Sequence, residues 1–515
     1  MGKLLNSYKE AIINDVKISI QEELSRYYAF AANQIEYTGN TPAISNSDYG
    51  TSFINNWYML FGKKISNSDI VPVISNNPWT ANTIYDIYDN TSNTLYVDNN
   101  YYVVTEPQEV GGLYHIYKCI DNNNNSNSTI DPSSIGTPTQ ETTFETGDGY
   151  KWRYITSIST FNYSKFATND YVPVYVNTSI QAASGNNSGV EIVEISNTGS
   201  GYNAYNDGTI LSNPNSTLVQ ISSNAASTNF FYNNNSIYIY NNVVSTSQLL
   251  IVNNYISNAS GNWVYLKTPA NTSSITDSVT QYKISPQVYF ETDGTTEPAA
   301  YSVVNTSSNS ISEIIILDKG SNISWANVSI FSSYGSGSNL YAIINPPGGH
   351  GSNPLSELNV KGFGISFTFS NTESNTIPTS NTLYNKIGMV KNPYSLQSNG
   401  SKGSIFTSNT FNNLLEANVS PAHTFTPGEI VFGANSGARG VVVISNSTYV
   451  HITGDKNFLN GEYLSNTTSN NITAITINDI GDIYTKDLVP LYIENINNVN
   501  RANTQSESYK LIITI

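Results

Sequence analysis

The four histidines, His115, His350, His423 and His451, are the residues of this 515-residue chain best suited to metal binding or acid–base chemistry. They lie far apart in the sequence, and none has a second ligand type at helical or hairpin spacing. His350 has the most suggestive surroundings because it lies in a Gly-Gly-His-Gly run. A loop histidine between glycines is usually a surface residue, so we expect His350 to be exposed. The sequence predicts no metal site.

Paired carboxylates are the second possible source of chemistry, since a glycosidase needs two of them beside the scissile bond. Glu145 and Asp148 lie close together beside aromatic residues, but Asp148 stands between Gly147 and Gly149 and is better explained as a turn residue. The sequence contains no Walker loop, nucleophile elbow or dinucleotide fingerprint. We therefore expect no enzyme, with no catalytic, cofactor-binding or metal-ligating residues and no cofactor.

The stretch after this turn reads as a well-anchored strand. Tyr150, Trp152 and Tyr154 alternate with Lys151 and Arg153, which predicts one aromatic and one cationic face. A strand in the protein core explains this pattern better than a platform on which a ligand stacks.

Composition limits the classes of partner. The formal net charge is −16 and no basic run occurs, which argues against binding to nucleic acid through phosphates. No apolar run approaches 18 residues, so we expect no membrane span, and we expect no export signal. The single cysteine, Cys119, cannot form a disulfide within the chain and is predicted to be a small buried hydrophobe.

The elements that must position these residues are mostly strands. Residues 6 to about 24 form the one convincing long helix, because apolar residues recur there at four-residue steps. The recurring residues are Tyr8, Ile12, Val16, Ile20 and Leu24, and Leu5, Ile13 and Ile18 widen the stripe, although residues 16–20 also alternate as a strand would. Residues 27–32 read as a buried strand, residues 56–61 as a short helix or turn, and residues 509–515 as a strand paired inside a sheet.

The predicted class is mainly β with minor α (α+β), multi-domain, with a discontinuous core domain, β-sandwich or barrel-like insertions and one long N-terminal helix.

Two similar stretches and one breaker cluster suggest the domain boundaries. Residues 189–202 and 311–323 each read as a strand followed by a Gly-Ser turn, and Asn345 begins the densest run of Pro and Gly. The core domain is predicted at 1–95 (helix plus strands), 346–395 and 481–515 (its C-terminal strand). A β domain with the Asp-Gly-Tyr-Lys-Trp motif is predicted at 96–183, a β-rich insertion with two diverged repeats at 184–345, and a small β insertion at 396–480.

These landmarks, in this order, resemble the baseplate wedge subunit of T-even-like contractile-tailed bacteriophages, in the long form with β-rich insertions. That family pairs an Asp-Gly-Tyr-x-Trp-x-Tyr motif with an upstream Tyr-Lys-Cys-Leu-like strand, as residues 148–154 and 117–120 do here. The other similar blocks are residues 27–30, 68–72, 83–89, 348–352, 386–393, 491–495 and 510–513. The sequence departs from the family at Ile496, where an arginine is usual.

The resemblance implies a structural role without catalysis. It implies a subunit of a phage tail baseplate wedge, which holds neighbouring wedge proteins in the six-fold baseplate and takes part in its rearrangement on infection. The expected partners are a second copy, as a homodimer within each wedge, and other baseplate wedge proteins, with no nucleic acid and no membrane. The expected location is the virion tail baseplate, after assembly in the bacterial host cytoplasm.

Two other classes share the Asn-, Ser- and Tyr-rich composition. A surface or secreted β-repeat adhesin or carbohydrate-binding protein is the alternative, and it should carry an export signal. A polysaccharide-degrading tail enzyme is the third hypothesis, and it would need carboxylates and aromatic residues clustered on one face.

Overall fold

The computed structural model describes residues 6–33, 57–92, 100–183, 188–373, 376–378, 382–502 and 504–515. The chain divides into two compact units, residues 1–73 with 361–515 and residues 74–360. Strands dominate both units, which confirms the mainly β class. The boundaries predicted near residues 95 and 184 lie outside the described residues. Among the described residues, no helix has the length and hydropathy needed to cross a membrane.

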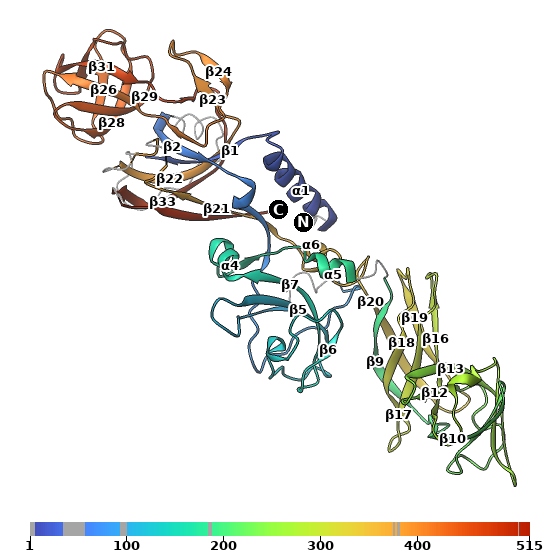
Figure 1. The fold of residues 1–515 in the computed structure, drawn as a ribbon. Coiled ribbons are helices and arrows are strands. Elements are labelled where there is room, and N and C mark those ends of the chain that lie inside the picture. Colours follow the sequence, from blue (N-terminus) through green and yellow to red (C-terminus); the bar gives the residue numbers. More distant parts are fainter. Residues whose placement is uncertain are drawn as a thin grey trace. The chain divides into compact units, whose positions relative to one another are not determined.

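The first unit is built on a five-stranded antiparallel sheet (Figure 1). Its order is β25 (Thr410–Asn412), β2 (Met59–Lys64), β1 (Tyr27–Ala32), β22 (Thr382–Lys391) and β33 (Pro490–Arg501). The predicted strand at 27–32 is confirmed as β1, the central strand. Phe30 pairs with Gly62 on one side and Gly388 on the other. Gly388 leaves room for the phenyl ring of Phe30, since a Cβ there would overlap it, and Gly62 leaves room for the ring of Phe411 in the same way.

Residues 59–61 are an exception to the predicted pattern. A short helix or turn was expected over 56–61, but only residues 57 and 58 are helical and Met59 begins β2. Met59, Leu60 and Phe61 are all fully buried, because β1 and β25 flank the strand on both edges.

A second sheet of the first unit contains β34 (Glu507–Thr514), β21 (Gly362–Phe369) and β3 (Ile70–Ser75). The prediction that the C-terminal residues pair inside a sheet is confirmed. The N-terminal helix is confirmed as α1 (Asn6–Gln21), which ends before Leu24. Of the predicted stripe, Ile13 and Ile20, two turns apart, are buried, whereas Tyr8 and Leu24 are exposed.

Residues 415–479 form a closed six-stranded barrel in the first unit (Figure 1). Its strands are β26 (Leu415–Ser420), β27 (Ile430–Gly433), β28 (Arg439–Ser445), β29 (Tyr449–Gly454), β30 (Tyr463–Asn466) and β31 (Thr473–Asp479). A small sheet of β23 (Tyr394–Leu396), β24 (Lys402–Ile405) and β32 (Ile483–Tyr484) completes the unit.

The second unit begins with a four-stranded antiparallel sheet that carries the Asp148 motif. Its order is β4 (Tyr102–Thr105), β5 (Leu113–Asp121), β7 (Lys151–Ser159) and β6 (Phe144–Glu145). The same unit contains α4 (Thr160–Phe166), β8 (Tyr171–Pro173), α5 (Thr178–Ala183) and α6 (Pro354–Glu357).

The rest of the second unit is a sandwich with a barrel inserted in the chain between β9 and β16. The closed barrel contains β10 (Asn206–Asn215), β11 (Leu218–Ile221), β12 (Ser236–Asn241), β13 (Thr246–Asn258), β14 (Gly261–Leu266) and β15 (Gln281–Ser285). One sandwich sheet pairs β9 (Val190–Ser200) with β20 (Ser336–Ile344). The other contains β16 (Gln287–Thr292), β17 (Ala299–Asn305), β18 (Ser310–Asp318) and β19 (Ala326–Phe331). Apolar residues of both sheets, including Val190 and Ile311, form one core.

Candidate functional site

The Asp148 turn is held by the aspartate carboxylate. Its Oδ2 accepts hydrogen bonds from the backbone N–H groups of Thr129 (2.7 Å) and Ile130 (3.0 Å), and its Oδ1 accepts one from the Thr146 hydroxyl. Burial by itself would raise the pKa of Asp148, but these hydrogen bonds outweigh it and lower the pKa. Gly149 adopts φ of 82°, a conformation that favours glycine. The predicted turn role of Asp148 is confirmed.

One face of the β5–β7 pair is the aromatic face that the alternation predicted. Trp152 is fully buried, stacks on Tyr150 with ring centroids 5.4 Å apart, and meets the Tyr85 ring edge to face at 5.7 Å. Cys119 pairs with Trp152 across the strands and is also fully buried, which confirms that prediction. Burial raises the pKa of the Cys119 thiol and so disfavours a reactive thiolate.

The other face of the same strand pair carries two cations in the protein interior. Lys118 and Arg153 are register partners on β5 and β7, so their side chains share one face. Lys118 is 0% exposed and Arg153 is 8% exposed. Two like charges that face each other across strands repel, and burial removes the water that would screen them. The face therefore needs carboxylates from elsewhere in the chain.

Glu357, at the end of α6, supplies the first carboxylate. Its Oε2 lies 2.6 Å from Lys118 Nζ, and its Oε1 accepts a hydrogen bond of 2.6 Å from the Gly351 backbone N–H. Burial favours the neutral acid, but the Lys118 charge outweighs that effect and lowers the pKa of Glu357. The Lys118–Glu357 pair is therefore a buried ion pair.

His350 lies between the two acids of the cluster and is 3% exposed, so the expectation of a surface histidine is wrong. Lys118 Nζ lies 3.0 Å from His350 Nδ1. An ammonium group can only donate, so Nδ1 accepts and the ring proton is placed on Nε2. Nε2 lies 3.6 Å from Glu191 Oε2, and the Tyr88 ring packs edge to face on the imidazole. The loop glycines bring the histidine inward instead of exposing it.

Glu191, near the start of β9, supplies the second carboxylate. It forms an ion pair with Lys319 and accepts a hydrogen bond of 2.9 Å from the Thr143 hydroxyl. Burial alone would raise the pKa of Glu191, but the charge of Lys319 and its hydrogen bond to the carboxylate outweigh that effect and lower the pKa. Its charge also favours the protonated guanidinium of Arg153. The ionic cluster, defined as Lys118, Arg153, Glu191, Lys319, His350 and Glu357, thus joins β5, β7, β9 and α6.

This arrangement suits a structural role better than a reaction centre. The side chains of Lys118, His350 and Glu357 are at most 2% exposed, so a solute could reach them only by displacing packed residues. Each carboxylate also has a cation and a hydrogen-bond donor within the protein. Over the described ranges, no three His, Cys, Asp or Glu residues are arranged to hold a metal ion.

The other candidate residues lie outside this cluster. His115 Nδ1 lies 2.8 Å from the Ser157 hydroxyl, and Glu145 is exposed on β6. In the first unit, His423 packs on Phe425, and His451 lies 3.9 Å from Glu416. The structure therefore brings only His350, of the four histidines, into the ionic cluster.

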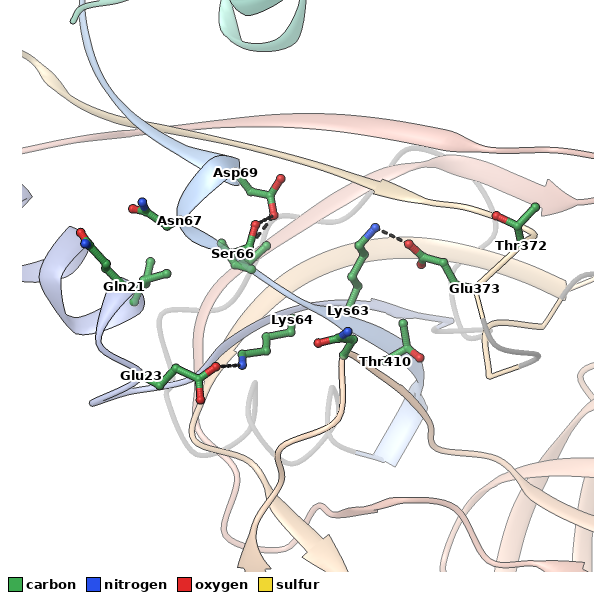
Figure 2. A pocket seen from close by; sticks show the side chains of 13 residues that line it. Gln21, Glu23, Lys63, Lys64, Ser66, Asn67, Asp69, Thr372, Glu373 and Thr410 are labelled. Atoms are coloured by element: carbon green, nitrogen blue, oxygen red, sulfur yellow. Dashed lines mark hydrogen bonds and ion pairs between the residues drawn. The ribbon is translucent and has the colours of Figure 1, made fainter.

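A cleft of about 780 Å³ lies in the first unit, near the end of α1 (Figure 2). Its two lysines are both paired with acids, Lys63 with Glu373 and Lys64 with Glu23. Lys63 also donates a hydrogen bond of 3.0 Å to the carbonyl of Thr368. Because the protein's own acids neutralise both lysines, the cleft presents no strong site for an anion.

Comparison with known proteins adds no assignment. No family model matches the chain, and no curated protein matches it.

Removing one member of the buried ion pair tests its importance. Lys118→Met leaves the Glu357 carboxylate buried without its cation, so we expect the free energy of unfolding to fall by about 3–5 kcal/mol. Lys118→Met combined with Glu357→Leu removes both charges and should recover most of that loss. Urea denaturation followed by tryptophan fluorescence measures both values.

The matched control for that experiment is Lys319→Met. The Lys319 side chain is 45% exposed, so its pair with Glu191 is partly solvated and its loss should cost less than about 1 kcal/mol. Equal losses in the single and double variants would show that packing, and not charge balance, is what Lys118 contributes.

Acid should weaken the second unit through the same carboxylates. The folded pKa values of Glu191 and Glu357 are lowered, so their stabilisation is complete above the unfolded pKa of about 4.3 and is lost as the pH falls through the folded values. We expect the free energy of unfolding to decrease below about pH 4. Glu357→Gln should show a shallower decrease in urea titrations at pH 7, 5, 4 and 3. Glu145→Gln, at an exposed position, should keep the wild-type dependence.

Proposed function

We propose that this chain is a structural subunit of a phage tail baseplate wedge, which holds neighbouring wedge proteins in a six-fold baseplate and takes part in its rearrangement on infection. In this proposal it forms a homodimer within each wedge and resides in the virion tail. The observation that supports it is that the sequence blocks similar to that family meet one another in the folded chain.

In the first unit, three of these blocks are neighbouring strands. Residues 27–30 lie in β1, residues 386–391 in β22 and residues 491–495 in β33, and these strands pair in that order (Figure 1). Residues 510–513 pair with β21, the central strand between β34 and β3 in the other sheet of the unit.

In the second unit, four blocks meet around Trp152 and the ionic cluster. Tyr85 packs on Trp152, and Cys119 pairs with it across the strands. Tyr88 contacts His350, which in turn contacts Lys118. Chance matches spread over a long chain have no reason to converge in this way, whereas the parts of one folding core must do so.

The ionic cluster suits this function physically. Three cations, Lys118, Arg153 and Lys319, face the carboxylates of Glu191 and Glu357, and every side chain of the cluster except that of Lys319 is buried. The cluster therefore stabilises the framework without exposing a reactive group. A subunit whose function is to hold neighbouring proteins needs a core of this kind. It binds those neighbours through surfaces that the core holds in position.

Labelling of particles tests the proposal directly. Antibodies raised against the purified chain should bind at the distal end of contractile tails in negatively stained virions of the phage that encodes it, and pre-immune serum should not. Labelling of the bacterial surface without labelling of virions would contradict the proposal and favour the adhesin alternative.

The proposed homodimer has a separate test. Light scattering of the purified chain at micromolar concentration should give about twice the 56.3 kDa of one chain. A mass of one chain across that concentration range would contradict dimerisation.

A further inference from the structure

An aromatic face runs along the outside of the sandwich in the second unit. Val288 and Phe290 of β16 point into the sandwich core, so the alternation of the strand places Tyr289 on the outer face. Phe331 of β19 lies on the same outer face, because it pairs with Gln287 two residues before Tyr289. Tyr289 is 55% exposed and Phe331 is 56% exposed.

The aromatic face continues onto the neighbouring barrel. Tyr301 of β17 also pairs with Gln287 and so belongs to the same face. Its ring stacks on Tyr238 of β12, with centroids 4.8 Å apart and planes at 11°. Tyr238 in turn stacks on Tyr240 at 5.3 Å and 17°. Three nearly parallel rings therefore continue the aromatic face, with Tyr238 and Tyr240 half-buried and Tyr301 buried beneath them.

Polar groups stand between these rings with their hydrogen-bonding capacity available. The amide of Gln287, the hydroxyl of Ser329 and the hydroxyls of Tyr238, Tyr240 and Tyr289 form no hydrogen bond to another residue in the described part of the chain. Ser329 is exposed and is the direct cross-strand neighbour of Tyr289. Hydrogen-bond donors and acceptors thus alternate with aromatic rings over this surface.

The face carries few charges. They are Lys283, with Nζ 5.6 Å from the Tyr301 ring centroid, Glu291 on β16, and Glu313 on β18, which acts electrostatically on Tyr301. This contrasts with the formal net charge of −16 for the whole chain. A neutral partner meets no electrostatic penalty here, whereas a polyanion would be repelled by the rest of the molecule.

We infer that this face, defined as Gln287, Tyr289, Ser329, Phe331, Tyr238 and Tyr240, binds neutral glycan chains. The apolar C–H faces of the sugar rings pack on the exposed aromatic rings, and the sugar hydroxyls exchange hydrogen bonds with the amide and hydroxyl groups between them. A protein partner would favour a face whose centre is continuous and apolar, but here Gln287 and Ser329 interrupt the aromatic residues. The inference does not rest on the proposed baseplate role.

Glycan binding by the purified full-length chain tests the inference. The probes are an array of neutral bacterial O-polysaccharides and native gels cast with dextran or mannan, with alginate as the polyanionic comparison. We expect binding to at least one neutral glycan and none to alginate. The double variant Tyr289→Ala with Phe331→Ala should weaken that binding by at least about tenfold.

Two further variants separate stacking from other effects. Tyr289→Phe keeps the ring and should retain most of the affinity. Tyr341→Ala, at a residue that is 45% exposed on β20 of the other sandwich sheet, should bind like the wild type. Unchanged thermal unfolding of each variant shows that the fold is retained.

Several results would overturn the inference. These are no binding to any neutral glycan, binding that the double variant leaves intact, or equal weakening by Tyr341→Ala. Loss of self-association in the double variant, without glycan binding in the wild type, would identify the face as a protein contact instead.

Discussion

The burial of Lys118 and Arg153 on one face of the β5–β7 pair is the constraint on which the second unit depends. Two cations that face each other away from water destabilise a sheet unless carboxylates meet them. Glu357 comes from α6 and Glu191 from the start of β9, both far from these strands in sequence. The buried cations therefore meet their carboxylates only when three parts of the unit are folded together. These are the sheet, the sandwich that begins with β9, and residues 346–357.

The opposite face of the same strands is packed with aromatic side chains. Trp152 and its aromatic neighbours fill that side, so both faces of β5 and β7 are covered. The Asp148 carboxylate anchors the turn that begins β7 by accepting backbone hydrogen bonds from residues 129 and 130. An aromatic core on one side and an ionic cluster on the other leave little freedom for the strand pair.

The proposed baseplate role and the inferred glycan binding involve different parts of the chain. The strands that pair around β1 lie in the blocks of resemblance to a baseplate subunit, and so do Lys118, Arg153 and His350, whose side chains are buried. The inferred glycan face lies on the sandwich and barrel, outside the regions of resemblance, where exposed rings alternate with available polar groups. A fixed framework that carries an exposed sugar-binding face would combine assembly with contact to a cell surface.

Local patterns in the sequence determined the β-rich class, the strand at 27–32, the C-terminal strand, the long helix and the turn at Asp148, because each depends on alternation, periodicity or glycine placement. Only the tertiary structure decided that His350 and Arg153 are buried and that residues 59–64 form a strand. Alternation shows which side chains share a face, but whether that face meets water depends on the distant segment that covers it. For Lys118 and Arg153 that cover is Glu357 and Glu191, whose roles no local pattern could reveal.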